Sequence, residues 1–315
     1  MQFNPNTSHY ASAVGAWLDS NFRDQFTVTV AFMEKLKQRG AFKRGSAYLV
    51  QPVFGSGNNT VAGVSNFNTA MNIPSDAGLS AVYTWSWYQG LTTVNAQEAA
   101  AINTEYEMVD LLEERLRSTV AQFGQVISND LFSNTDANLG KIAGLPYAVD
   151  RPTTTANSFG GISRSNTTNP WWRAVVVDAS NQALTLQRLA DAYNRATENG
   201  GISPDIIVMP TAHFSAFEAL LLATQQYRQD DEIARAGFVG YLFKGATVLF
   251  DPRVPNNTIF IINSRDVMLV SQTERPSAEP VEFPDRLVRG YKHGLAVAFV
   301  AKRLNSNARI NNITT

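Results

Sequence analysis

The feature that most constrains the fold is a long, regularly spaced series of apolar residues. They recur every three or four positions between Asn95 and Phe132, which is the period of an α-helix. The series consists of Ile102, Tyr106, Val109, Leu112, Leu116, Val120, Phe123, Ile127 and Leu131. We expect Asn95 to cap the first turn, with Glu98 reaching back to it. The sequence therefore predicts one uninterrupted helix over 95–132, roughly 55 Å long, which is more than a compact monomer needs.

The composition indicates a globular chain with less charged surface than usual. Its 315 residues are 44% apolar, enough to bury one large domain or two. Charged residues make up 17%, below the roughly 25% of ordinary soluble proteins, and the formal net charge is -1. Cysteine is absent, which excludes disulfides and thiolate metal sites, and we find neither a signal peptide nor a transmembrane run. We therefore predict a protein made in the cytosol, with no membrane partner and no strong electrostatic attraction to nucleic acid.

A second unusual stretch is nearly free of charge. Between residues 46 and 94 the only charged side chain is Asp76. Two strand patterns, 47–51 and 81–88, flank a Gly- and Asn-rich middle. The second pattern is predicted to place three aromatic side chains on one face, namely Tyr83, Trp85 and Trp87. Because a two-stranded ribbon is marginal in water, these side chains need a surface to lie on, either the core of the same chain or a neighbouring subunit.

A basic run precedes the uncharged stretch. Five positive charges lie within the ten residues from Lys35 to Arg44. Such a run is typical of a solvated helix end, of a surface that pairs with acidic residues, or of a nucleic-acid patch. Since the first half of the predicted long helix is acidic, we expect the two surfaces to meet between neighbouring subunits. The basic members are Lys35, Lys37 and Arg39, and the acidic members are Glu105, Asp110 and Glu113.

A segment rich in glycine and tryptophan follows the predicted long helix. Its two parts are Gly160-Gly161-Ile162-Ser163-Arg164 and Asn169-Pro170-Trp171-Trp172-Arg173. The glycine pair allows a tight turn, and Pro170 fixes the chain before two large side chains that need burial. The sequence predicts a tightly packed cluster of side chains, held in place by Arg173, which we call the structural knot. Its members are Gly160, Gly161, Arg164, Trp171, Trp172 and Arg173.

From residue 180 onward the pattern changes to alternating helices and strands. The predicted elements are a helix over 181–198, a buried strand over 206–209, a helix over 211–226, two strands within 238–250 and further strands over 258–262 and 267–270. After a proline-rich linker, residues 295–300 are apolar at every position, which is typical of a strand in a sheet that is covered on both faces. The sequence thus predicts an α+β protein.

No residue pattern in the chain is typical of a catalytic or metal site. The three histidines, His9, His213 and His293, lack metal-ligand spacing, and neither a P-loop nor a nucleophile elbow occurs. Ser215 and Glu218 share a predicted helix with His213, but consecutive turns of one helix rarely form a working triad. We therefore predict no enzymatic activity, no cofactor and no bound metal.

The order of these elements carries a resemblance to a known family. The long helix, the glycine pair and the Asn169-Pro170-Trp171-Trp172-Arg173 segment, together with Phe243-Lys244-Gly245 and Asp251-Pro252, resemble the major capsid protein of tailed double-stranded DNA bacteriophages. The resemblance covers essentially the whole chain. It implies the Hong Kong 97-type fold and a subunit that self-assembles into the hexamers and pentamers of an icosahedral shell around the phage genome.

The resemblance also implies a division into segments. These are an N-terminal arm over 1–44, an extended β-hairpin loop over 45–93, a peripheral domain with a spine helix over 94–178, an axial domain over 179–264 and return strands of the peripheral domain over 265–315. In this family the extended loop lies over the peripheral domain of an adjacent subunit. That placement would cover the uncharged ribbon.

Further expectations concern partners, location and crosslinking. Because Met1 directly precedes the arm, we expect a separate scaffolding protein. We also expect a portal, decoration proteins, and weak non-specific contact with packaged double-stranded DNA. The location would be the virion, assembled in the host cytoplasm. Some members of the family join subunits through a lysine in the extended loop. Since residues 45–93 contain no lysine, we expect a shell without covalent crosslinks.

Two other classes of protein stay open on the sequence alone. An encapsulin-like nanocompartment uses the same fold to enclose a protein cargo. A soluble hydrolase or binding protein would instead elute near the chain mass of 34.6 kDa.

Overall fold

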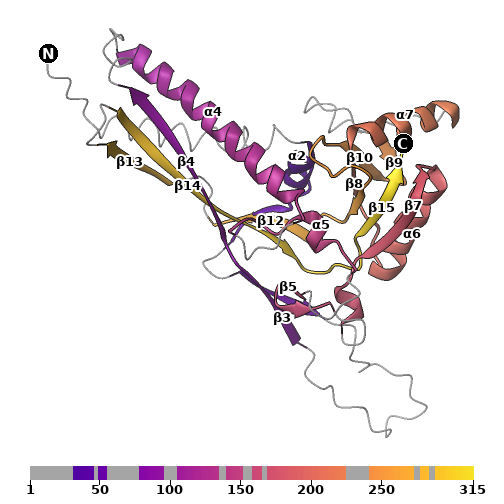
Figure 1. The fold of residues 1–315 in the computed structure, drawn as a ribbon. Helices are drawn as coiled ribbons and strands as arrows, with labels where there is room; N and C mark the ends of the chain where they lie inside the picture. Colours follow the sequence, from indigo (N-terminus) through magenta and orange to yellow (C-terminus); the bar gives the residue numbers. More distant parts are fainter. Residues whose placement is uncertain are drawn as a thin grey trace, which may run out of the picture.

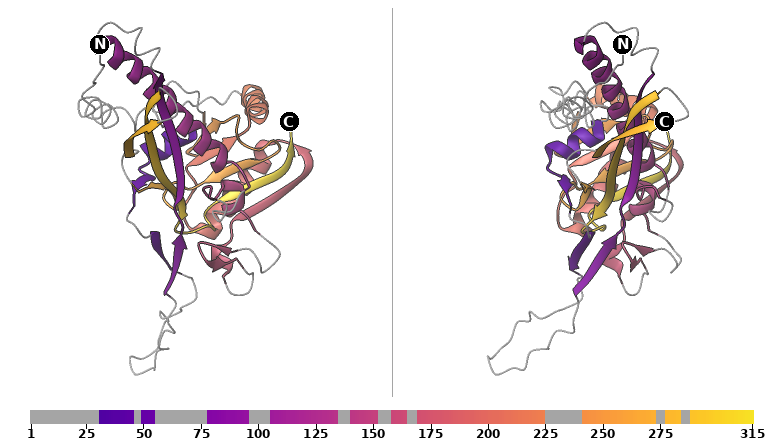
Figure 2. Two further views of the ribbon diagram at one scale, coloured as in Figure 1. Left: turned by 60° about the vertical axis from the view of Figure 1, so that its left-hand side comes forward. Right: turned by 90° about the vertical axis from the view of Figure 1, so that its left-hand side faces the viewer.

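The fold consists of two β-sheets with helices packed on them (Figure 1). The computed structural model describes residues 31–45, 49–54, 78–95, 105–134, 140–151, 158–164, 169–224, 241–272, 277–283 and 288–315. Within these residues one sheet has five strands and the other has six. Two further pairs of strands extend from this body (Figure 2).

Strand β14 (Val288–Ala301) is the centre of the five-stranded sheet. Strand β4 (Ser86–Asn95) pairs antiparallel with residues 288–297 of β14, and β13 (Ser277–Phe283) pairs with residues 288–294. These two strands therefore flank β14 on opposite edges. Strand β12 (Val267–Ser271) continues the pairing at the far end of β14, and β1 (Phe42–Arg44) runs parallel to β12.

The apolar run in β14 is buried on both faces. Every residue from Leu295 to Ala301 is at most 2% exposed. This confirms the prediction of a sheet covered on both sides, since side chains of successive residues point to opposite faces.

Helix α4 (Glu105–Leu131) packs along β4 on one face of this sheet (Figure 1). The predicted apolar stripe is confirmed where side chains are described, because Leu112, Leu116, Val120, Phe123, Ile127 and Leu131 are all buried. The helix approaches the strand closely at Gly90. A β-carbon at this position would lie 2.8 Å from Cε2 of Phe123, so the contact requires glycine.

The predicted start of the long helix stays a prediction. Asn95 is the last residue of β4 and is paired with Val288 of β14, and residues 96–104 lie outside the described residues. From Glu105 to Leu131, helix α4 has 27 residues, or about 40 Å. Ile102 and Glu98 lie outside the described residues, and the side chains of Tyr106 and Val109 are not described.

The predicted strand over 81–88 is divided in two. Strand β2 (Leu49–Phe54) pairs with β3 (Gly78–Tyr83), and the chain is irregular at Thr84 and Trp85 before β4 begins. The alternation changes phase at this break: Tyr83 is buried, whereas Trp87 is exposed and Tyr88 is buried. The prediction that Tyr83, Trp85 and Trp87 share one face is therefore wrong.

The six-stranded sheet forms the second half of the core. Its strands, in spatial order, are β7 (Val175–Ala183), β15 (Ala308–Thr314), β11 (Ile259–Ile262), β8 (Ile206–Met209), β10 (Ala246–Phe250) and β9 (Tyr241–Phe243). Helices α6 (Leu186–Gly200) and α7 (Thr211–Thr224) pack on one face. The other face joins the core of the five-stranded sheet through residues such as Val208 and Phe260. The β9–β10 turn at Lys244-Gly245 is confirmed, with φ of 50° and 85°.

Two predicted boundaries need correction in this region. Strand β15 pairs with β7 and β11, so the end of the segment 265–315 belongs to the six-stranded sheet and not to the peripheral return strands. Helix α6 begins at Leu186, where Thr185 Oγ1 accepts a hydrogen bond from the Arg188 backbone N–H, and Asn181 lies in β7. A strand that pairs with a distant partner, β15, outweighs the local helical pattern.

A polar seam connects the two sheets. The Asp205 carboxylate accepts hydrogen bonds from the backbone N–H and the hydroxyl of Ser264, at 2.8 and 2.5 Å. Asp266 accepts one from the Ser306 hydroxyl at 2.5 Å and contacts the Arg303 guanidinium at 3.3 Å. These bonds join loops at the ends of both sheets and fix how the sheets are oriented.

The glycine pair offers a test of the fold. It forms the turn between β5 (Ser158–Phe159) and β6 (Ile162–Ser163), with φ of 59° at Gly160 and 74° at Gly161. Only at Gly160 would a β-carbon be crowded, 3.0 Å from both Ala81 Cβ and Tyr83 Cζ, whereas Gly161 is open.

We expect Gly161→Ala to lower the free energy of unfolding by about 1 kcal/mol through backbone strain alone. Gly160→Ala should lower it by a further 1–2 kcal/mol or so, because the hairpin strand must also shift. Denaturant unfolding of the two variants measures the difference, and equal losses would contradict this packing.

Candidate subunit interface

One face of the five-stranded sheet carries exposed apolar side chains. Along β4, Tyr88 and Thr92 are buried under α4, whereas Trp87 and Leu91 point away from the helix and are 61% and 48% exposed. Leu91 is paired in register with Lys292 of β14, and Lys292 is paired with Glu279 of β13. We call the exposed set on this side the outer sheet face. It consists of Trp87, Gln89, Leu91, Lys292 and Glu279.

Hydrogen bonds under helix α4 hold the strand that presents this face. The Tyr88 hydroxyl donates to Asp130 Oδ2 at 2.8 Å and accepts from the Ile142 N–H at 3.2 Å. Burial is the main cause that raises the pKa of Tyr88, so it stays a donor at neutral pH. Lys141 Nζ lies 3.3 Å from Asp130 Oδ1. The side chains at 87 and 91 are therefore presented by a rigid strand.

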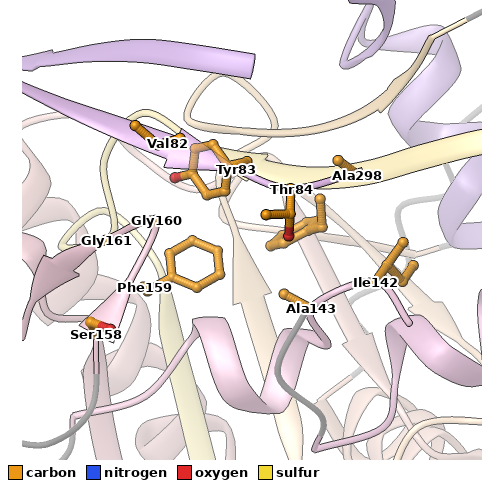
Figure 3. Close-up of a pocket in the computed structure, with 11 residues that line it drawn as sticks. Val82, Tyr83, Thr84, Ile142, Ala143, Ser158, Phe159, Gly160, Gly161 and Ala298 are labelled. Carbon is orange, nitrogen blue, oxygen red and sulfur yellow. The ribbon is translucent and has the colours of Figure 1, made fainter. Parts of the chain in front are cut away.

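The root of the β2–β3 hairpin is fixed by Tyr83. Its hydroxyl donates to the Ala301 carbonyl at 2.7 Å and accepts from the Ala301 N–H at 3.2 Å. The Val82 N–H donates to the Gly160 carbonyl at 2.9 Å, which ties the hairpin to the β5–β6 turn. A pocket of about 180 Å³ lies at this junction, between Tyr83, Phe159, the glycine turn and Phe299 (Figure 3). Burial raises the pKa of Tyr83.

The predicted knot is a buried cluster centred on Arg164. Arg164 is 1% exposed, donates to the Tyr147 carbonyl at 2.6 Å and stacks on the Tyr147 ring at 4.9 Å. Trp172 is fully buried, and its indole N–H donates to the Phe159 carbonyl at 2.9 Å. The central cation is thus Arg164, whose pKa is lowered chiefly by burial. The sequence prediction gave that role to Arg173.

The other members of the knot lie around this centre. Trp171 is half-buried and packs edge-on against Trp172 at a ring distance of 5.4 Å. Arg173 is half-buried after the short helix η2 (Pro170–Trp172). Arg309 of β15 and Arg164 both donate to carbonyls of the one-turn helix α5 (Leu145–Ala148). The knot therefore attaches the glycine turn to the six-stranded sheet.

The structure places the three predicted basic residues in different environments. Lys35 lies in helix α2 (Ala31–Gln38) and is completely buried within its own chain, which contradicts its place on a subunit surface. Four apolar neighbours in sequence, Ala31, Phe32, Met33 and Leu36, are buried with it, so α2 turns this face toward the core. Lys37 is half-buried, and Arg39 is exposed with its guanidinium 3.7 Å from Asp205 of the same chain.

The predicted acidic and aromatic residues also differ in environment. Asp110 is exposed on α4, and Glu113 pairs with Arg117 of the same helix at 2.6 Å. Glu105 begins α4, but its side chain is not described. Among the aromatic residues Trp87 is exposed, Trp85 is half-buried and Tyr83 is inside its own chain.

Sequence reasoning missed Leu91, Lys292 and Glu279 as neighbours of Trp87. The alternation of β4 from Ser86 onward would have found Leu91, because it is four residues from Trp87 on a strand. The other two could not be found without the register of β14. In the described part of the chain, no helix has both the length and the apolar character of a membrane span.

The chain has the fold of a phage capsid subunit. It is similar to a chain in the capsid asymmetric unit of cyanophage A-1(L), with 19% identity, a TM-score of 0.63 and coverage of 91% of this chain and 94% of that one. It is also similar to a capsid structure of Mycobacterium phage Bobi, with 12% identity, a TM-score of 0.55 and coverage of 89% and 90%. The SrpI encapsulin of Synechococcus elongatus matches with 12% identity, a TM-score of 0.57 and coverage of 86% and 84%.

A comparison of sequences identifies the family. The profile of the family described as SU10 major capsid protein matches residues 91–291, which is more than half of the chain. No curated protein matches the sequence. The chain therefore belongs to the SU10 major capsid protein family, and it is a structural, shell-forming capsid protein of a phage. The predicted family and α+β fold of the Hong Kong 97 type are confirmed.

The burial of Lys35 leads to a prediction. We expect Lys35→Glu to lower the free energy of unfolding by at least about 3 kcal/mol, because it places a carboxylate inside the core where an ammonium group has its contacts. The matched change Lys43→Glu, at an exposed position of β1, should stay within about 0.5 kcal/mol of wild type. Thermal or denaturant unfolding measures both. Equal stability of the two variants would contradict a buried role for Lys35.

Proposed function

We propose that this chain forms the hexamers and pentamers of an icosahedral shell that encloses the double-stranded DNA of a phage. The observation that carries the proposal is the outer sheet face, which exposes Trp87 and Leu91 on a rigid strand. The two side chains lie on the same face of β4 with Gln89 between them. Large apolar side chains exposed on one face are typical of a surface that a partner covers. Membership of a major capsid protein family supports a second copy as that partner.

We further propose that the β2–β3 hairpin of one copy covers the outer sheet face of the next. The exposed side chains described on β3 and just after it, Ser80, Val82 and Thr84, carry no charge, and Val82 is 57% exposed. The stretch 46–94 contains a single charge. An uncharged hairpin suits the apolar centre of the face, and Lys292 and Glu279 suit a polar rim. Obligate interfaces of this kind bury roughly 2,000 Å² or more.

A weaker charge contact accompanies this apolar contact in the proposal. Lys37 and Arg39 of one copy would face Asp110 and the neighbouring acidic residues of α4 in another. Lys35 has no part in it, because it is buried. Since the pairs would be solvent-exposed, they contribute little to affinity and act mainly on the orientation of the subunits.

The remaining partners follow from a shell that is filled with DNA. We propose a separate scaffolding protein, a portal and decoration proteins as partners, weak non-specific contact with packaged DNA, and a location in the virion after assembly in the host cytoplasm. The formal net charge of -1 supports weak contact, because each neutralised phosphate would add attraction that impedes packaging. Electron microscopy of the protein expressed alone and with a candidate scaffolding protein tests the shell. Small species under both conditions would contradict it.

The encapsulin-like alternative is disfavoured, although the fold allows it. The SrpI encapsulin matches the fold, but the family profile that matches this chain is that of a phage capsid protein. Mass spectrometry of purified particles separates the two. A shell that encloses DNA agrees with the proposal, and a shell filled with a single protein cargo contradicts it.

The outer sheet face can be tested by substitution. We expect the double change Trp87→Gln and Leu91→Gln to leave the fold intact and to reduce the yield of particles at least about tenfold, because the apolar contact between copies is lost. The matched control is Val126→Gln, which changes another apolar side chain that is 48% exposed, on α4. Circular dichroism checks the fold, and sedimentation measures the particles. Normal particle yield from the double variant would contradict the interface.

The absence of lysine from residues 45–93 gives a further prediction. Purified particles that are boiled in SDS should run as a single band near 34.6 kDa, because no lysine in the loop is present to form an isopeptide bond between subunits. A ladder of multimers on the gel would contradict a shell held without covalent crosslinks.

A further inference from the structure

A buried histidine lies where helix α4 meets the five-stranded sheet. His293 of β14 is 1% exposed and is the register partner of Gly90 on β4. Its Nε2 lies 3.1 Å from Thr92 Oγ1, which lies 3.0 Å from Thr119 Oγ1 on the helix. The Thr119 hydroxyl donates to the Arg115 carbonyl at 3.0 Å. This chain of hydrogen bonds connects β14, β4 and α4.

The second ring nitrogen of His293 is buried without a partner. Among the described residues, no group forms a hydrogen bond with Nδ1. The space above Gly90 is filled by Phe123, since a β-carbon on Gly90 would lie 2.8 Å from its ring. A buried nitrogen without a described partner favours the neutral imidazole, because a charged ring would need an acceptor or water here.

The charged groups around His293 offer no compensation for a proton. From α4, Arg115 is cationic and donates to the Thr93 carbonyl at 2.5 Å. The carboxylates described on that helix are paired or exposed: Glu113 pairs with Arg117, Asp130 is bound by Tyr88 and Lys141, and Asp110 and Glu114 are exposed. On β14 itself, Tyr291 is half-buried on the same face and Lys292 points to the opposite face.

The two neighbouring strands differ in charge on this face. On β13 the register partner of His293 is Ala278, and Glu279 is paired with Lys292 on the outer sheet face. Glu282, whose side chain is not described, is paired with Arg289, four residues from His293 along β14. On β4 the neighbours of His293 are Gly90 and the hydroxyl of Thr92. Burial alone lowers the pKa of His293 to about 4.

We propose that His293 is an acid-sensitive joint, at which uptake of one proton loosens helix α4 from β4 and β14. Protonation makes Nδ1–H a donor without an acceptor and places a cation near Arg115, so the helix must move to admit water. The same strands present Trp87 and Leu91 on their outer face. Under the proposed function, acid would therefore change the contacts between subunits.

The direction of the effect follows from the pKa values of the two states. In the unfolded chain His293 has its ordinary pKa of 6.5, and in the fold the pKa is about 4. The stability from the neutral ring is fully present above pH 6.5 and is lost as the pH falls from 6.5 toward 4. Between pH 7.5 and pH 5 this group alone should raise the unfolding equilibrium constant about 30-fold.

Denaturant unfolding of the full chain at pH 7.5 and pH 5 tests the joint. The variant is His293→Gln, and the control is His213→Gln, which changes a second buried histidine, on α7. The Nδ1 of His213 also has no partner among the described residues, but its Nε2 lies 3.2 Å from the Ile313 carbonyl, a backbone acceptor for a ring proton, whereas the Nε2 of His293 has the Thr92 hydroxyl. We expect the equilibrium constant of wild type and of the control to rise about 30-fold more than that of His293→Gln. An equal rise in all three proteins would overturn the proposal.

Hydrogen exchange of the wild-type protein gives a second readout, which needs no variant. After correction for intrinsic rates, peptides from α4 should lose protection at pH 5 relative to pH 7.5, while peptides from α7 keep theirs. Loss of protection in both helices, or in neither, would overturn the proposal. Both measurements use the unassembled subunit, so a failure of the shell proposal would show separately, as an absence of particles at pH 7.5.

Discussion

The structure depends on the pairing of β14 along both of its edges. Strands β4 and β13 flank residues 288–294, and β12 continues to Ala301, so the backbone hydrogen bonds of a 14-residue strand are satisfied by three separate strands. Helix α4 depends on this five-stranded sheet, because the apolar stripe of the helix needs an apolar surface to pack against. The close contact at Gly90 and Phe123 shows how tightly the two are fitted. A rigid strand then presents Trp87 and Leu91 to a partner.

The fold could be predicted from the sequence where one local pattern dominated. The stripe from Leu112 to Leu131 and the turn at Lys244-Gly245 belong to this group. Prediction failed where distant pairing decided the outcome: Asn181 lies in a strand because β7 pairs with β15, and β15 joins the six-stranded sheet. The candidate interface could be predicted only in part. Trp87 could be found because it lies in an uncharged, aromatic strand pattern, whereas Lys292 and Glu279 are brought to the same face only by the register of β14 with β4 and β13.

The positions of charged residues were the hardest to predict from the sequence. Lys35 belongs to a basic run that a helix end in water would explain, yet it is fully buried, because α2 also carries Phe32, Met33 and Leu36 on that face. Similarly, Arg164 is the centre of the knot although Arg173 follows the two tryptophans directly. A charge pattern says that a side chain needs polar partners, but the partners can be carbonyl groups inside the same chain. The surface contacts of a shell are therefore better sought among exposed apolar residues.

The central claim is that the outer sheet face is covered by the hairpin of a second copy. Electron cryomicroscopy of assembled particles at side-chain resolution tests it most directly, through the surroundings of Trp87 in neighbouring subunits. The account predicts that Trp87, 61% exposed in the single chain, is buried against the β2–β3 hairpin of an adjacent subunit. Particles in which Trp87 and Leu91 stay in contact with solvent would contradict it.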